Sequence, residues 1–327
     1  MVSKVSADGT FVSPYLKTRL DALRAAQNAD GGWGYFPGKE SWLEPTAYAA
    51  MAFAGEPEGE RAWKLLSSWQ LADGSWQTSG KVPISSWGTS LCVTIAIGRN
   101  EWNDPTRKGV QWLVQSAGEE SAWFQVVATK IGLIKGRNVA LKSWPWKPGN
   151  SGWVEPTAHA LVALKKASVK WPGADLRERV RMGEGELADV RSSDGGWNYG
   201  SPAALGVDLP SYPETTALAL VGLQEKKDLG GAFELASKMM LDTPSPLARA
   251  WLKIAMRLHG MNPPDADDAA SKESGKNLDK ELGKELSKEL GKAKGDAMVT
   301  AVEALSAVEG NWSSMRTAES SSTGARG

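Results

Sequence analysis

The chain has 327 residues, enough for one large domain with a sizeable buried core. Its 38 basic and 38 acidic residues cancel, and no Lys/Arg-rich block indicates nucleic-acid binding. A single cysteine, Cys92, excludes an internal disulfide and argues against a cysteine-based zinc site, so we expect it in the core and expect no metal or cofactor.

Residues 1–13 are expected to form an N-terminal tail. They lack the 7–15-residue apolar core of a signal peptide, and no apolar run approaches the ~18–20 residues that cross a bilayer. We therefore expect a cytoplasmic protein without a transmembrane segment, with peripheral membrane contact left open.

Two kinds of helical segment alternate from residue 14 onward. Mixed charged and apolar positions at helical spacing predict amphipathic outer helices at 14–27, 60–70, 106–116 and 230–241. Apolar segments predict buried inner helices at 44–54, 87–97, 121–134, 155–166, 213–224 and 245–258. This alternation predicts an all-α protein, a single α/α toroid of six hairpins over 14–261, with an outer helix missing between 134 and 155.

The pattern is interrupted at 262–295, a charged low-complexity segment with leucine at every fourth position from 278 to 290. We expect a surface helix or a partly disordered insertion there, rather than a helix that binds a partner. Residues 296–312 are expected to complete the toroid with a helix and a turn. Residues 313–327 are expected to be a disordered, Ser-rich tail.

A turn recurs along the chain. Asp-Gly-Gly-Trp at 30–33 and 194–197 and Asp-Gly-Ser-Trp at 73–76 are its clear copies, and 150–153 and 309–312 are weaker ones. Aspartate can bond its own backbone two residues on, and glycine accepts a positive φ, so each copy predicts a helix end followed by a turn. The tryptophan, one of 16 in the chain, is expected to pack over that turn.

Three inner helices begin with an acidic residue next to a proline. The acidic residues are Glu44, Glu155 and Glu214, and this pairing suits a helix start. Inner-helix starts surround one mouth of a toroid, so these glutamates either accept bonds from free helix N–H groups or mark where a ligand enters. We expect the ligand to contact Glu44, Glu214 and the aromatic residues beside these starts, which are Trp42, Trp87, Trp153 and Tyr212.

The turns resemble part of the QW motif of the squalene–hopene cyclase and protein-prenyltransferase β-subunit superfamily. Gln27 and Gln70 each precede Gly-x-Trp by three residues, with leucine four residues upstream. Arg191 stands where a third glutamine is expected, and 108–113 matches only the front half of the motif. The resemblance implies a toroid in which the glutamine caps a helix and stacks on the tryptophan, and an isoprenoid-like apolar ligand in a central cavity.

The resemblance also indicates where catalysis is expected. Cyclases of this kind protonate an alkene with the middle Asp of an Asp-x-Asp-Asp-Thr-Ala motif, and Asp-Ala-Asp-Asp-Ala-Ala at 265–270 makes Asp267 a superficial match. The Asp, Cys and His zinc ligands of prenyltransferases are not found around Cys92. Glu155 and His159 are four residues apart on one helix face, so they form an acid–base pair, two metal ligands lining the cavity, or a helix-terminal charge with a histidine bonded to it.

Two functions follow from this sequence. The first is an isoprenoid cyclase-like or prenyl-transfer-like enzyme, and the second is a non-catalytic toroid that binds a protein, peptide or lipid partner. A polysaccharide-active α/α barrel is a third interpretation, because tryptophan-rich clefts also hold sugars, although the Gln-to-Trp spacing argues against it.

Overall fold

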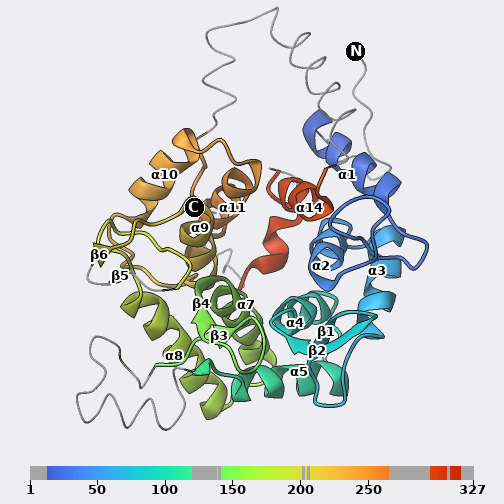
Figure 1. Cartoon of the computed structure of the whole chain (residues 1–327), viewed down its shortest axis with the longest axis horizontal. Coiled ribbons are helices and arrows are strands. Elements are labelled where there is room, and N and C mark those ends of the chain that lie inside the picture. The colour runs from blue at the N-terminus through green and yellow to red at the C-terminus, as the bar shows by residue number, and fades with distance from the viewer. Residues whose placement is uncertain are drawn as a thin grey trace, which may run out of the picture.

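The structure, a computed structural model, describes residues 13–119, 138, 141–200, 203–204, 207–264, 295–307 and 310–317. Helices dominate this part of the chain, and its strands form short two-stranded hairpins. Along its shortest axis the molecule is a ring of helices surrounded by an outer layer (Figure 1). The protein is an α/α toroid, as the alternating pattern predicts.

Six of the described helices form the inner wall of the ring. They are α2 (Leu43–Ala52), α4 (Thr89–Gly98), α7 (Val154–Lys170), α9 (Pro213–Gly222), α11 (Pro246–Leu258) and α14 (Ala297–Leu305). Each packs on the next in this order, and α14 packs back on α2, so these helices close the ring (Figure 1). Nearly every residue of α2, α4 and α9 is buried, because these apolar helices are covered on all sides.

The outer layer is amphipathic. Its described helices are α1 (Pro14–Ala26), α3 (Pro57–Ser67), α5 (Asp104–Gln115), α8 (Ala174–Asp189) and α10 (Ala232–Asp242). Helix α3 packs on α2, α5 on α4 and α7, α8 on α7, α10 on α9 and α11, and α1 on α14. The four predicted outer helices are confirmed, and α8 is a fifth that the sequence analysis misses. No helix in the described ranges is long and apolar enough to cross a bilayer.

The sixth inner helix differs from the prediction. The sequence analysis places it at 121–134, which lies outside the described residues. In the structure α14 occupies the sixth position, between α11 and α2, and α4 packs directly on α7. Helices α5 and α7 therefore form one outer–inner pair, so the ring needs no outer helix between 134 and 155.

Four buried tryptophans join the end of an outer helix to the start of the following inner helix. Each indole Nε1 donates to a leucine carbonyl in the last turn of the outer helix, at 2.6–2.9 Å. Each tryptophan backbone N–H donates to a threonine hydroxyl in the first turn of the inner helix, at 2.9–3.1 Å. The sets are Trp33 with Leu23 and Thr46, Trp76 with Leu66 and Thr89, Trp144 with Leu113 and Thr157, and Trp197 with Leu187 and Thr216. Last-turn carbonyls lack partners inside their helix, so the repeated tryptophan satisfies them and fixes the hairpin.

The glutamines of the repeat link consecutive outer helices. Gln27 and Gln70 each donate from Nε2 to a turn glycine, at 2.8 and 3.0 Å, and to a carbonyl in the first turn of the next outer helix. Arg191 makes the same two kinds of hydrogen bond as the glutamines. It donates to the Gly195 carbonyl at 2.8 Å and to the Leu229 carbonyl, just before α10, at 2.7 Å. A basic residue can therefore serve at this position.

The fourth copy of the repeat is interrupted, and the predicted copy at 150–153 is wrong. Leu113, in the front half at 108–113, receives its indole bond from Trp144, 31 residues later. Trp153 is instead exposed, directly before α7. Arg179 of α8 covers Trp144, with its guanidinium 3.2 Å from the ring centroid. The predicted copy at 309–312 is also not one, since Gly310 leads into a short 3-10 helix.

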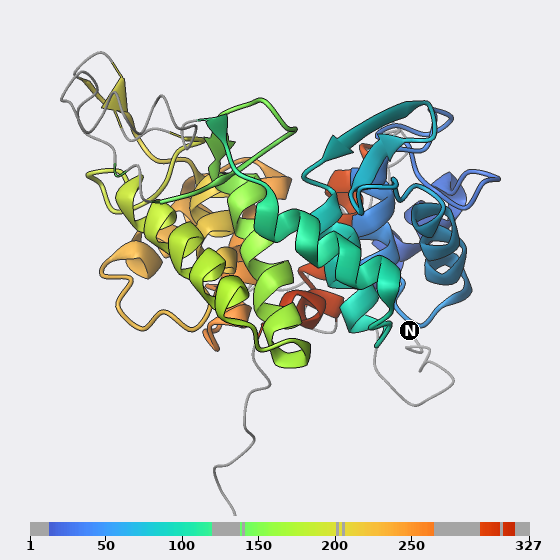
Figure 2. The ribbon, with the colours of Figure 1, turned by 90° about the horizontal axis from the view of Figure 1, so that it is seen from below.

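The two ends of the ring differ. At the end where the inner helices start, antiparallel hairpins β1–β2 (Trp76–Ser79, Val82–Ser86), β3–β4 (Trp144–Pro145, Gly152–Trp153) and β5–β6 (Ala203–Ala204, Val207–Asp208) precede α4, α7 and α9 (Figure 2). At the opposite end the 3-10 helix η2 (Asn311–Met315) packs against α2, α4, α11 and α14.

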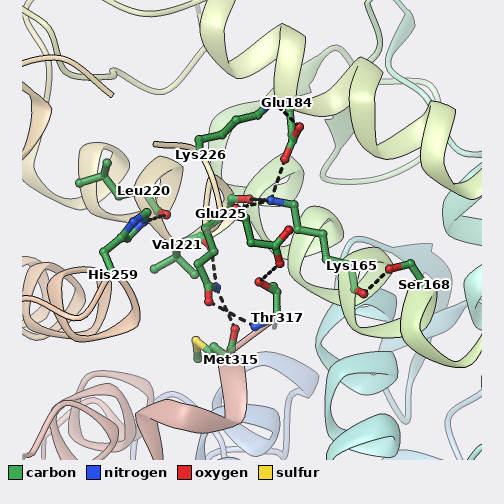
Figure 3. Close-up of polar contacts among 12 residues, drawn as sticks. Lys165, Ser168, Glu184, Leu220, Val221, Glu225, Lys226, His259, Met315 and Thr317 are labelled. Atoms are coloured by element: carbon green, nitrogen blue, oxygen red, sulfur yellow. Dashed lines mark hydrogen bonds and ion pairs between the residues drawn. The ribbon is translucent and has the colours of Figure 1, made fainter. Parts of the chain in front are cut away.

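The C-terminal segment bonds to several inner helices at this opposite end. Asn311 donates to the Ala52 carbonyl at 3.0 Å, and Gln224 donates to the Met315 carbonyl at 2.9 Å. The Thr317 N–H donates back to the Gln224 Oε1 at 3.2 Å (Figure 3). The disordered tail expected at 313–327 therefore starts too early: 313–317 belong to the folded ring, and 318–327 lie outside the described residues.

Candidate active site at the mouth of the ring

Four carboxyl groups gather at the mouth, the end where the inner helices start. Glu44, Glu155 and Glu214 lie in the first turns of α2, α7 and α9, and Asp296 caps α14. Acidic residues are favoured there because the free N–H groups of a helix start carry positive partial charge. The carboxyls also interact with one another, Glu155 with Glu44 and Glu214, and Glu44 with Asp296. All three glutamates predicted at the mouth are brought together.

The four carboxyls differ in their hydrogen bonds. Glu44 accepts from the Tyr35 hydroxyl at 2.5 Å, Glu214 from the Ser245 hydroxyl at 3.1 Å, and Asp296 from its own helix at 2.8 Å. Glu155 accepts no hydrogen bond from a described residue, and none of the four forms an ion pair with a described Lys or Arg. The carboxyl groups at the mouth therefore have no described cation beside them, and Glu155 has no hydrogen-bond donor among the described residues.

The environment of Glu155 favours its protonated form. Desolvation first, and then the negative charges of Glu44 and Glu214, raise its pKa to about 8. Desolvation and Asp296 also raise the pKa of Glu44, although the bond from Tyr35 opposes the rise. At neutral pH, Glu155 is thus a carboxylic acid that can donate a proton, with two further glutamates beside it.

Exposed aromatic rings lie beside these carboxyls. Trp153 and Tyr212 directly precede α7 and α9 and are 38% and 44% exposed. Tyr199, 45% exposed, lies with its ring centroid 5.2 Å from that of Tyr212, and its carbonyl accepts from the Val154 N–H. Trp153, Tyr199 and Tyr212 form an aromatic platform, and such exposed apolar surface is typical of a ligand-binding groove.

His159 is not a partner of Glu155. It is almost fully buried, and its Nε2 lies 3.0 Å from the Tyr48 hydroxyl. Burial lowers its pKa to about 3, so the imidazole is neutral. Glu155 does lie in the first turn of α7, as the helix-terminal interpretation expects, but the expected bond between Glu155 and His159 is wrong, because α7 directs the histidine into the ring.

An aromatic cluster fills the ring below the mouth. The Trp87 ring lies 5.1 Å from Trp146 and 5.3 Å from His159, and the Trp251 ring lies 5.5 Å from Tyr48. Trp87 is only 9% exposed, so it is a core residue rather than the ligand contact that the sequence analysis predicts. These side chains occupy the interior by packing on one another.

The remaining predicted site residues divide into two groups. Trp42 is partly exposed at the start of α2, with its ring 6.2 Å from Tyr35, and remains beside the mouth. Asp267 lies outside the described residues, so the structure does not place it. Cys92 is fully buried, as predicted. The described residues contain no group of three or more His, Cys, Asp or Glu arranged to hold a metal ion.

Several residues of the site are missed by the sequence analysis. Asp296 carries a recognisable signal, since an aspartate directly before an apolar helix is a typical N-cap. Tyr35, Tyr48 and Tyr199 carry no such signal, because a tyrosine near a helix start is as often a packing residue as a bonding partner.

Comparison with known proteins supports the fold. No family model and no curated protein matches the chain. Among solved structures, it is similar to an α-1,6-mannanase from a Salegentibacter species in complex with α-1,6-mannotriose, with a TM-score of 0.54 and 9% identity over 90% of this chain and 99% of that chain. It is also similar to Rex8A from Paenibacillus barcinonensis, complexed with xylose, with a TM-score of 0.53 and 10% identity over 95% and 97% of the two chains. A type II terpene cyclase, MstE from Scytonema, matches at 18% identity over 78% and 76% with a TM-score of 0.48. At these identities the likeness shows the fold and not the activity.

Proposed function

We propose that the mouth is the active site of a carbohydrate-active enzyme and that Glu155 is its general acid. The observation that supports this most directly is the pKa of Glu155, raised to about 8 beside two further glutamates. A carboxylic acid beside a second carboxyl group is the arrangement that glycoside hydrolysis uses.

The proposed reaction divides the work between two glutamates. Glu155 donates its proton to the glycosidic oxygen as the bond to the leaving sugar breaks. Glu214 on the adjacent helix α9 takes a proton from water, which adds to the sugar carbon, because one Glu214 oxygen is not held by Ser245. The aromatic platform of Trp153, Tyr199 and Tyr212 stacks on the sugar rings.

The same pKa argues against alkene protonation. A cyclase needs an acid stronger than an ordinary carboxylic acid, whereas burial makes Glu155 a weaker one. Protonation of an oxygen leaving group works best with a pKa near the operating pH, which suits Glu155. The mannanase and Rex8A share only the fold with this chain, so the proposal rests on the chemistry of the mouth.

Release of reducing ends from a panel of polysaccharides, including α-mannan and xylan, tests the proposal. We expect hydrolysis by the wild type, a rate that falls above about pH 8 as Glu155 ionises, and a loss of about 100-fold or more in Glu155→Gln. Glu178→Gln, which changes an exposed carboxylate on α8, is the matched control and should retain full activity. Inactivity of the wild type on every polymer, or equal rates for Glu155→Gln and wild type, would refute the assignment.

Isoprenoid binding, with membership of the superfamily that the turns resemble, is the second candidate. The exposed aromatic rings of Trp153, Tyr199 and Tyr212 favour it, because aromatic faces bind apolar ligands and stabilise cations. Saturable quenching of tryptophan fluorescence by farnesol would support this candidate. Binding of neither sugar nor isoprenoid would favour the non-catalytic toroid with a protein, peptide or lipid partner.

A further inference from the structure

A cavity of about 570 Å³ lies at the opposite end of the ring from the mouth. The last turns of α2 and α4, helix α3, Lys166 of α7 and the segment 311–314 line it. Its apolar wall includes Met51, Trp63 and Ile95, and space is left where Gly98 has no side chain. Its volume falls in the range of small-molecule sites, about 300–1,000 Å³.

Two consecutive lysines of α7, the buried Lys165 and the half-buried Lys166, differ in their hydrogen-bond and ion-pair partners at this end of the ring. Lys165 donates to the Gly222 and Gln224 carbonyls at 3.1 and 2.7 Å and forms an ion pair with Glu184 at 2.7 Å (Figure 3). All three of its N–H groups and its charge are therefore satisfied within the protein.

Lys166 lacks that compensation. Its ammonium, which lines the cavity, donates to the Ser314 and Arg316 carbonyls at 3.0 and 3.2 Å. An ammonium has three N–H groups, and the described residues supply neither a third acceptor nor a carboxylate within 4 Å of Lys166. Burial lowers the pKa of Lys166, the direction expected when a charge lacks a counter-ion.

A second unsatisfied polar group belongs to Ser314, whose backbone carbonyl accepts from this ammonium. The Ser314 hydroxyl oxygen is buried and has no hydrogen-bond partner, although Ser314 lines the cavity. Unsatisfied buried polar atoms are rare in folded proteins and call for an explanation. A bound acceptor group would give Lys166 its third hydrogen bond, and rotation of the Ser314 side chain toward the cavity would let its hydroxyl donate to the same group.

The other charged groups on the cavity wall bond to one another, with two carboxylates around one guanidinium. Arg99 binds both Glu60 oxygens at 2.7 Å and Glu101 at 2.8 Å. The Glu101 carboxylate also accepts from the Trp63 indole at 2.9 Å. Lys166 is therefore the one cavity-lining cation of the described chain without a carboxylate partner.

We propose that this cavity binds a monocarboxylate with a hydrocarbon body, its carboxylate on Lys166 and Ser314 and its chain against Met51, Trp63 and Ile95. Among the described residues, Lys166 is the one cation on this wall that is available to a ligand. The excess negative charge of the Arg99, Glu60 and Glu101 group disfavours a doubly charged phosphate, so a single carboxylate fits best. The site lies at the other end of the ring from the mouth and does not depend on the function proposed there.

Isothermal titration calorimetry of the full chain with octanoate tests this site. We expect saturable binding to the wild type and at least about tenfold weaker binding of octanamide, which has the same chain without the charge. Lys166→Met should weaken octanoate binding at least about tenfold, whereas Lys170→Met, one turn further along α7 and exposed, should leave it within about twofold. Inorganic phosphate alone should give no saturable heat.

A second variant separates loss of the site from loss of the fold. Gly98 has open space where a side chain would extend, so Gly98→Leu should fill the cavity and abolish octanoate binding without changing the thermal midpoint greatly. Absence of saturable octanoate binding to the wild type would overturn the proposal. So would equal affinity for octanoate and octanamide, or unchanged octanoate affinity in both variants.

Discussion

Replacing Glu155 by glutamine removes one titratable group from the mouth and leaves the size of the side chain nearly unchanged. In the wild type, the pKa rises from about 4.5 in the unfolded chain to about 8 in the folded protein. Between these values the folded state keeps a proton that the unfolded state releases. The contribution of this group to stability is therefore fully present below about pH 4.5 and is lost as the pH rises through 8.

The size of the effect follows from the pKa change. At about 1.4 kcal/mol per pH unit, the wild type should lose up to about 5 kcal/mol relative to Glu155→Gln between pH 4.5 and 8.5. Because the side chain is partly exposed and water screens its charge, we expect at least about 2 kcal/mol of this difference.

Urea denaturation of both proteins across this pH range measures the difference in the free energy of unfolding. Burial of His159 acts in the opposite sense, since its pKa of about 3 destabilises the fold as the pH falls below about 6.5. That contribution is common to both proteins and cancels in their difference. Stability curves that stay parallel within about 1 kcal/mol would refute the desolvated environment assigned to Glu155.

Two further substitutions test how the ring is held together, both measured by urea denaturation. Gly74→Ala should lower the free energy of unfolding by about 2 kcal/mol or more, because φ is +93° and a Cβ would lie 2.7 Å from the Lys108 carbonyl oxygen. Gly38→Ala, also at positive φ but in open space, should lower it by about 1 kcal/mol. Equal losses for the two variants would contradict the packing argument. Lys165→Met should lower the free energy of unfolding by about 3 kcal/mol, because it leaves two carbonyls and part of the Glu184 charge unsatisfied. Lys170→Met, at an exposed position, should lower it by less than about 0.5 kcal/mol. Similar losses for the two variants would contradict the network in Figure 3.

The sequence predicts the architecture well because each hairpin repeats the same local chemistry. The turns at 30–33, 73–76 and 194–197 each form the predicted helix end with the tryptophan packed over it. The prediction fails where the leucine and the tryptophan of one motif are far apart in the sequence but bonded in the structure. Leu113 and Trp144 bond across the segment between them, so a motif of fixed length cannot detect the pair, and the inner helix is then assigned to 121–134.

The sequence predicts only those residues of the site that belong to the recurring pattern at the inner-helix starts. Glu44, Glu155 and Glu214 share a pattern that places them at the mouth, and the structure brings them together there. The direction of His159 could not be predicted, because a helix that is buried on all sides gives no sign of which face points into the ring. Asp296 influences Glu44 only after α14 closes the ring beside α2.

The same topology accounts for both proposed sites. From α2 to α11 an outer helix returns the chain between successive inner helices, so these inner helices begin at one end of the ring and finish at the other. Their starts place free N–H groups and the glutamates at the mouth, where desolvation and carboxyls of like charge raise the pKa of Glu155. Their ends, at Ala52 and Gly98, leave carbonyls and small residues that the C-terminal segment covers only in part. A polar, acidic mouth and a cavity with one cation at the other end are therefore separate consequences of one helical arrangement, and each can be altered without the other.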